Sequence, residues 1–206
     1  MISLKTIFLS IVLVSFFHAQ AMQESEQQSD SLLRASQRGD LEQVIELLSN
    51  ADININIQDS KGLTPLHWAI VNNHEHIIRE LLEHGASTII KTESFLQDND
   101  GYTPGHIAVM RGNLKIVQAL TSVNNGWDNW INVSNNMGNT PLHFAASAQN
   151  PNPEIIKTLC NAGALVNARN NRERTALHIA MLYGHDDVVA QLLYYGADIS
   201  LISRLC

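Results

Sequence analysis

Cysteine and positive charge are both scarce in this chain of 206 residues. Its two cysteines, Cys160 and Cys206, are too few for a disulfide framework or for a zinc site built from thiolates alone. Because Cys160 lies in an apolar helical pattern, we expect a buried free thiol there, with a bridge to Cys206 as the alternative in an oxidising compartment. The 13 basic residues against 20 acidic ones give a net charge of −7, which argues against free nucleic acid as a partner.

The sequence also lacks the common motifs of catalysis. It has no nucleophile elbow, no glycine-rich phosphate loop and no paired-cysteine zinc site. We therefore predict neither an enzyme nor a cofactor. The alternative of another class is a metal-binding protein or an enzyme that uses His74, His76 and His84. Its weakness is the spacing, because residues two apart point to different faces of a helix, unlike the two histidines of a His-Glu-x-x-His zinc motif.

The longest apolar run is confined to the N-terminus. Residues 7–17 form it, and 11 residues of helix span about 16 Å, roughly half of a bilayer core. Lys5 precedes the run, and Ala19 and Ala21 give the small-x-small pattern of a signal-peptidase site. We expect a secretory signal peptide at residues 1–21, with an uncleaved membrane anchor as the alternative.

Cleavage after residue 21 would place the protein in the periplasm or in the medium, with no stable membrane insertion afterwards. It would remove one lysine and no acidic residue, so that the net charge of the mature chain falls from −7 to −8. Polar side chains fill the next segment, residues 22–29, which we predict to be a flexible tether.

What the sequence does contain is one pattern, repeated. Four copies of a Thr-x-x-His tetrapeptide begin at residues 64, 103, 140 and 175, and an alanine stands two residues after each histidine. A second apolar helix is predicted after each alanine, and Gly-Ala closes three of the four copies, at 85–86, 163–164 and 196–197. A period of this length predicts a stack of small helical units that share one continuous core.

This pattern resembles the ankyrin repeat over about residues 30–200. The resemblance implies an all-α solenoid of about five helix-turn-helix repeats with hairpin loops, in a domain that covers residues 30–206. Thr would cap the first helix of a repeat, and Gly would end the second in left-handed backbone. The tetrapeptide histidines would tie adjacent repeats through the hairpin backbone. We place the repeats at about residues 30–62, 63–101, 102–138, 139–174 and 175–206, the first being a cap without the tetrapeptide.

The chain departs from the family pattern in its spacing. Successive tetrapeptides are 39, 37 and 35 residues apart, where the family repeat has about 33. The extra residues lie in segments 87–97, 123–130 and 150–153, and the second of these stands in place of a Gly-Ala closure. Glu173 occupies the tip-glycine position of the last hairpin, which leaves open whether that hairpin keeps the usual shape.

The resemblance implies a protein partner, bound at the hairpin tips and on the exposed side of each first helix. Tyr, Met and Arg are residue types that anchor interfaces. Residues 95–96 together with Trp127 and Trp130 would form the main epitope; alternatively, both Trp side chains fold back over repeat 3 and replace its missing closure. The candidate binding residues are Leu63, Val71, Phe95, Leu96, Tyr102, Met110, Arg111, Trp127, Trp130, Met137, Arg172, Arg174, Leu182 and Tyr183.

These features together predict an extracytoplasmic protein-binding scaffold that acts through its concave face and long hairpin loops. The alternative within the same fold is a secreted effector that binds a host protein. Tyr194 and Tyr195 lie in the second helix of the last repeat, where the family usually has polar residues. We therefore expect a monomer, or weak self-association through the C-terminal repeat.

Overall fold

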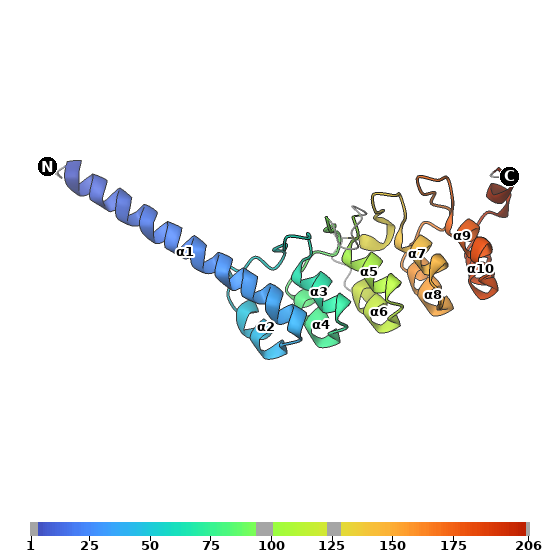
Figure 1. The fold of residues 1–206 in the computed structure, drawn as a ribbon, viewed down its shortest axis with the longest axis horizontal. Helices are drawn as coiled ribbons and strands as arrows, with labels where there is room; N and C mark the ends of the chain where they lie inside the picture. The colour runs from blue at the N-terminus through green and yellow to red at the C-terminus, as the bar shows by residue number, and fades with distance from the viewer. Residues whose placement is uncertain (1–3, 94–100, 123–128, 205–206) are drawn as a thin grey trace.

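The protein is a row of stacked helix pairs with loops along one side (Figure 1). The computed structural model describes residues 4–93, 101–122 and 129–204. Within these ranges no strand occurs, and the expected all-α repeat stack is confirmed. The elements are α1 (Leu4–Arg38), α2 (Leu41–Leu48), α3 (Pro65–Val71), α4 (Glu75–Glu83), α5 (Pro104–Met110), α6 (Leu114–Ser122), the 3-10 turn η1 (Trp130–Asn132), α7 (Pro141–Ser147), α8 (Pro153–Asn161), α9 (Ala176–Tyr183), α10 (Asp186–Tyr194) and the 3-10 turn η2 (Ile199–Arg204).

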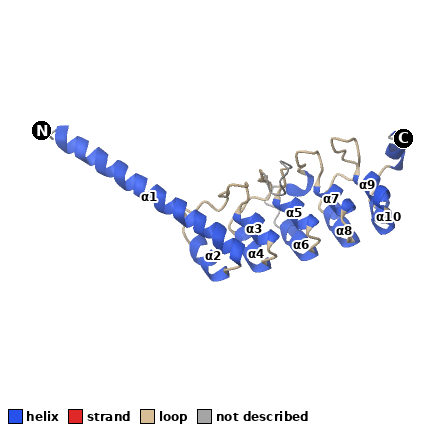
Figure 2. Ribbon diagram, viewed as in Figure 1, coloured by secondary structure: helices blue, strands red, loops and turns tan. Residues whose placement is uncertain are grey.

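The helices form two rows (Figure 2). The first helices of the repeats, α1, α3, α5, α7 and α9, make an inner row beside the loops, and α2, α4, α6, α8 and α10 make an outer row. Each helix packs on its equivalents in the neighbouring repeats and on its partner in the same repeat. We call the surface formed by the loops and the exposed side of the inner row the inner face.

Each tetrapeptide sets where an inner helix begins. In repeat 2 the Thr64 hydroxyl accepts the backbone N–H of His67 at 3.4 Å, and the His67 ring accepts the backbone N–H of Thr64 at 3.1 Å. Pro65 follows in the first turn, where a missing N–H leaves no hydrogen bond unmade. The same reciprocal cap begins α5, α7 and α9.

The hydrophobic core runs the length of the stack between the two rows. The alanine of the repeat pattern is at most 4% exposed in all four copies, which lets the two helices of a repeat lie close together. Outer-row side chains such as Ile78 and Leu82 of α4 are at most 2% exposed and pack between repeats. Because each repeat buries an apolar face on its neighbour, the stack is stabilised from one unit to the next.

The N-terminal polar segment differs from the prediction. Residues 22–29 are helical and belong to α1, so the expected flexible tether is wrong. The Ser25 hydroxyl donates to the carbonyl of Asp52 at 2.9 Å, and the hydroxyl of the buried Ser29 accepts the N–H of Asn54 at 3.1 Å. These bonds fasten the helix to the loop after α2. No helix in the described ranges is both long and apolar enough to cross a bilayer.

All three insertions lie at least partly in the described ranges. The segment 150–153 lengthens the turn between α7 and α8 as predicted, and the Asn152 side chain caps α8 by accepting the N–H of Glu154 at 3.0 Å. In the segment 87–97, Thr92 pairs with Tyr102 through backbone and hydroxyl bonds of 2.8 and 3.0 Å. Residues 94–100 lie outside the description.

Trp130 supplies the closure that repeat 3 lacks. In repeats 2, 4 and 5 the N–H of the closing alanine bonds the carbonyl of a buried outer-row leucine, as Ala86 does with Leu81 at 2.9 Å. Leu120 is the corresponding leucine of repeat 3, and its carbonyl instead accepts the indole N–H of Trp130 at 3.2 Å. Trp130 is 2% exposed, so the alternative in which it folds back is confirmed, and its place in a surface epitope is wrong. Trp127 lies outside the described residues.

The Trp130 ring occupies space that a side chain on α5 would otherwise fill. Gly105 stands where three of the tetrapeptides have leucine. A Cβ atom added there would lie 1.9 Å from a ring carbon of Trp130, which no real packing allows. The indole therefore takes the volume of the missing leucine, and these two departures from the family pattern compensate each other.

The C-terminal end of the stack exposes apolar side chains. Met181 of α9 and Leu193 of α10 are 48% and 42% exposed. Their equivalents in repeat 2, Ile70 and Leu82, are 1% and 2% exposed because repeat 3 covers them. Self-association through this end stays a prediction.

Candidate protein-binding face

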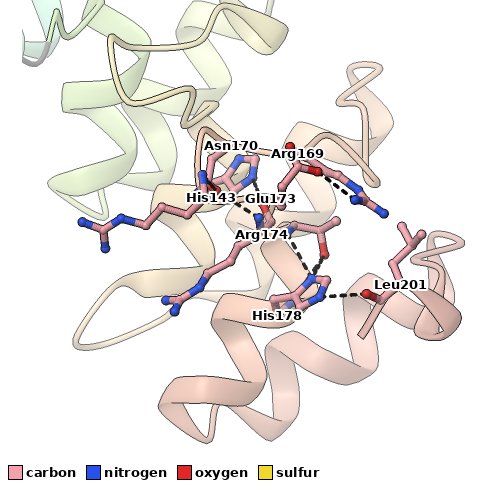
Figure 3. A network of polar contacts seen from close by, with 9 residues as sticks. His143, Arg169, Asn170, Glu173, Arg174, His178 and Leu201 are labelled. Carbon is pink, nitrogen blue, oxygen red and sulfur yellow. Dashed lines mark hydrogen bonds and ion pairs between the residues drawn. The ribbon is translucent and has the colours of Figure 1, made fainter. Parts of the chain in front are cut away.

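The tetrapeptide histidines hold the loops of the inner face in place. Each ring accepts the backbone N–H of its own threonine at Nδ1, so Nε2 carries the proton. In His67, His106 and His143 this proton is donated to the hairpin before the next inner helix, and in His178 it is donated to η2 of the same repeat. Figure 3 shows the last two of these bonds, from His143 to the carbonyl of Arg174 and from His178 to that of Leu201. The four Nε2 distances are 3.4 Å for His67, 3.0 Å for His106, 3.0 Å for His143 and 3.1 Å for His178. The predicted tie between adjacent repeats is confirmed for His67, His106 and His143.

Three of these rings are held neutral by their surroundings. Desolvation by burial lowers the pKa of His67 and of His106 from 6.5 to about 4, against the opposing effect of the carbonyl bond. Burial also lowers the pKa of His143. A neutral ring is what the bonding pattern needs, since a protonated Nδ1 could not accept the threonine N–H.

Asx turns stiffen the hairpin tips. In the last hairpin the Asn170 side-chain oxygen accepts the N–H groups of Arg172 and Arg174, both at 3.0 Å. Asp59 and Asn135 do the same in the hairpins that precede α3 and α7, over distances of 2.8 to 3.1 Å. Adjacent tips are joined by backbone bonds, as from the N–H of Asn171 to the carbonyl of residue 137 at 3.0 Å. The loops therefore form a pre-organised surface.

The last hairpin keeps the family shape in spite of Glu173. Its φ of +58° lies in the left-handed region, beside +76° for Gly62 and +78° for Gly138 at the same position. Its N–H bonds the carbonyl of Asn170 at 2.9 Å, as the glycine N–H does in the other hairpins. An exposed ion pair from Arg169 at 2.8 Å holds the carboxylate.

We expect Glu173→Gly to stabilise the stack. Left-handed backbone costs a non-glycine residue about 1–2 kcal/mol, whereas an exposed ion pair contributes at most about 1 kcal/mol. Urea unfolding should therefore show a gain of about 1 kcal/mol in the free energy of unfolding. Arg169→Ala, which removes the ion pair alone, is the control and should change stability little. An equal loss of stability in both variants would contradict backbone strain at Glu173.

The structure divides the predicted binding residues into four groups. Six are exposed on the inner face, and Val71 and Arg174 are half-buried there. Leu63, Tyr102 and Trp130 are at most 4% exposed, so their assignment to the surface is wrong. Phe95, Leu96 and Trp127 lie outside the described residues. The exposed six are Met110, Arg111, Met137, Arg172, Leu182 and Tyr183.

Leu63 and Tyr102 share one position in the repeat. Each directly precedes a capping threonine, where the hairpin turns into the inner helix. The Tyr102 ring packs edge-on against Phe144 of the next repeat, with the ring centres 5.6 Å apart. Arg174 holds the same position in repeat 5, but it is only half-buried, so the position alone does not determine exposure.

One cleft gathers four of the predicted residues. It lies between the inner helices α7 and α9 and the last hairpin, and its volume is about 190 Å³. Arg172 and Arg174 come from the hairpin, and Leu182 and Tyr183 come from the end of α9. Phe144 of α7 forms part of the wall, a residue that the sequence did not single out because the residue after each tetrapeptide varies between the copies.

The structure does not assemble His74, His76 and His84 into a metal site. His74 Nε2 bonds the carbonyl of Gln37 in α1 at 3.3 Å, and His84 Nδ1 bonds that of Glu80 at 2.8 Å. In the described part of the chain, no three His, Cys, Asp or Glu side chains are grouped to hold a metal ion. His185 bonds Ala146 across the equivalent junction of repeats 4 and 5 at 3.0 Å, which indicates a packing role for this position.

Cys160 is half-buried and has no disulfide partner among the described residues, and burial raises the pKa of its thiol to about 11. Cys206, the other candidate for a bridge, lies outside the described residues.

Comparison with known proteins decides the family. A family model described as "Ankyrin repeats (3 copies)" matches residues 32–132 and 122–203. The chain belongs to the ankyrin-repeat family. As an ankyrin-repeat protein it has the hairpin-plus-helix-pair unit that the structure shows along the whole described stack.

The curated relatives of this ankyrin-repeat chain are much larger proteins. It is 31% identical to Rabankyrin-5 of Mus musculus over 80% of this chain, and 31% identical to Palmitoyltransferase AKR1 of Debaryomyces hansenii over 86%. It is also 27% identical to the Nuclear factor NF-kappa-B p105 subunit of Rattus norvegicus over 90%. The alignments cover only 13%, 26% and 18% of those proteins, so the chain spans about a quarter of their length at most.

Proposed function

We propose that this chain is an extracytoplasmic protein-binding scaffold that recognises its partner with the inner face and carries out no chemistry itself. The observation that carries the proposal is the cleft between repeats 4 and 5, where Arg172, Arg174, Leu182 and Tyr183 converge from two elements. Aromatic and arginine side chains on a rigid backbone are the usual anchors of protein interfaces. The shared ankyrin repeats support protein binding as the general role.

The test is loss of partner binding when the inner face is altered. Leu182 and Tyr183 are 64% and 59% exposed, so replacing both with alanine should leave the fold intact. If they anchor a partner, the double variant should bind about thirtyfold more weakly, the effect of a loss of about 2 kcal/mol. Affinity capture from the extracytoplasmic fraction supplies the partner, and Arg79→Ala on the outer row is the control. Equal binding by both variants and the parent would refute an inner-face site.

Export rests on the N-terminal pattern and on how α1 is fastened. Ser25 and Ser29 make bonds to the loop after α2, and both follow the expected cleavage point at residue 21. Leu32 and Ala35, which are completely buried, also lie beyond that point. A chain that begins at residue 22 would therefore retain these contacts.

We expect the mature protein to begin at Met22. The intact mass of exported protein should correspond to residues 22–206, and a chain produced without residues 1–21 should unfold within about 0.5 kcal/mol of the full chain, as changes away from buried contacts do. Finding residues 1–21 in the exported material would contradict the proposed signal peptide.

A further inference from the structure

The cleft between repeats 4 and 5 differs in charge from the chain as a whole, which is acidic. We propose that it binds an acidic segment of a protein partner, in which a carboxylate meets Arg172 and Arg174 and an adjacent apolar side chain meets Phe144, Leu182 and Tyr183. This inference rests on the proposed function and specifies the class of partner for the same face.

The two arginines are held side by side and are not neutralised. Both backbone N–H groups are fixed by the Asn170 side chain, and Arg172 and Arg174 line the same cleft. In the described part of the chain neither of them forms an ion pair. The intervening Glu173 is engaged by Arg169 at 2.8 Å, and in Figure 3 the Arg174 guanidinium points away from that pair. The result is a local positive site in a chain of net charge −7.

The geometry of guanidinium groups favours a carboxylate. Arginine presents a planar fork of donors that binds carboxylates with two parallel hydrogen bonds. The buried His143 lies in the cleft wall, but its ring is already committed to Thr140 and Arg174. The two arginine side chains are thus the charged groups in the cleft that remain available to a ligand.

The remaining walls suit a peptide side chain. Phe144, Leu182 and Tyr183 give an apolar surface, and Tyr183 stacks on His185 with the ring centres 5.8 Å apart and the planes 19° apart, which orients its ring. Asn139 and Ser147 add polar atoms that can bond a peptide backbone. The volume of about 190 Å³ is below the roughly 300 Å³ of the smallest usual cofactor sites, and it fits a side chain or two.

The test is a selection of random peptides displayed on phage against the intact protein. Enriched sequences should carry Asp or Glu next to an apolar residue. One enriched peptide is then synthesised with a fluorophore, together with a matched form whose carboxylates are replaced by amides, and binding is measured by fluorescence polarisation. The amide form should bind at least tenfold more weakly, and raising the salt concentration should weaken only the acidic form appreciably.

Protein variants locate the site independently. Arg174→Gln and Arg172→Gln remove charge while keeping the backbone bonds of the hairpin, and each should weaken the acidic peptide about tenfold. Arg79→Gln on α4, an exposed arginine of the outer row, is the matched control and should bind like the parent. Circular dichroism melts check that the three variants are equally folded, and the amide peptide tests the charge without altering the protein.

The outcomes separate this inference from the proposed function. The acidic preference would be overturned if enriched peptides bound the inner face without acidic residues, or if they bound Arg174→Gln as tightly as the parent. Neither result would contradict the proposed function as a protein-binding scaffold. Displacement of the peptide by inorganic phosphate at lower concentration than by acetate would assign the cleft to phosphate instead, and would also overturn it. Enrichment of no peptide at all would count against both.

Discussion

Replacing Trp130 with alanine should lower the free energy of unfolding by about 3–5 kcal/mol, the range for removing a fully buried large aromatic side chain. The loss has two sources. The cavity would open against α5, where Gly105 offers no side chain to fill it, and the carbonyl of Leu120 would lose its only described donor. Denaturant unfolding monitored by circular dichroism measures the change.

Gly105 provides the matched test of that packing. Gly105→Leu alone should be strongly destabilising, because its Cβ would overlap the Trp130 ring. Combined with Trp130→Ala, the same leucine enters the vacated space. The double variant should therefore lose less stability than the sum of the losses in the two single variants. Additive losses in the double-mutant cycle would show that the two positions do not share one volume.

Acid should destabilise the stack between about pH 6.5 and pH 4. His67 and His106 have a pKa of about 4 in the folded chain, below the usual 6.5 of an unfolded histidine. The unfolded chain therefore binds more protons in this window. Stability is complete above pH 6.5, falls as the pH decreases, and levels off below about pH 4. By linkage each ring contributes a loss on the order of 3 kcal/mol.

The measurement is the free energy of unfolding as a function of pH. His106→Gln removes one of the two rings and should reduce the slope between pH 4 and 6.5 while lowering stability at pH 7, because the bond to the carbonyl of Asn139 is lost or weakened. A profile as steep as that of the parent would assign the acid sensitivity to other groups.

The features that the sequence predicted correctly are local ones. The tetrapeptides fix helix starts through Thr64 and its equivalents, and the histidine ties depend only on the spacing within a repeat and to the next hairpin. The role of Trp130 could be offered only as an alternative, because it depends on a glycine 25 residues earlier in the chain. The contact between this glycine and Trp130 is visible only in the three-dimensional structure.

The errors also have identifiable physical causes. The polar composition of residues 22–29 predicted a tether, but a helix needs only one anchored face, and Ser25 and Ser29 supply it. Leu63 and Tyr102 were assigned to the surface from their repeat position, although neighbouring side chains decide whether that position is covered. The candidate cleft was predicted in part: its arginines, Leu182 and Tyr183 were named, and Phe144 was not.

The bonds between repeats have a direction. From His67 to His143 the imidazole donor belongs to the earlier repeat and the carbonyl acceptor to the later one, whereas His178 bonds Leu201 within its own repeat. A ribosome makes the chain in that same order, so each new hairpin meets a donor that is already in position. The stack can therefore lengthen by the addition of one repeat at a time at one end. Loss of the last repeat would leave a single imidazole N–H without its carbonyl acceptor, while the earlier repeats would keep all of their ties.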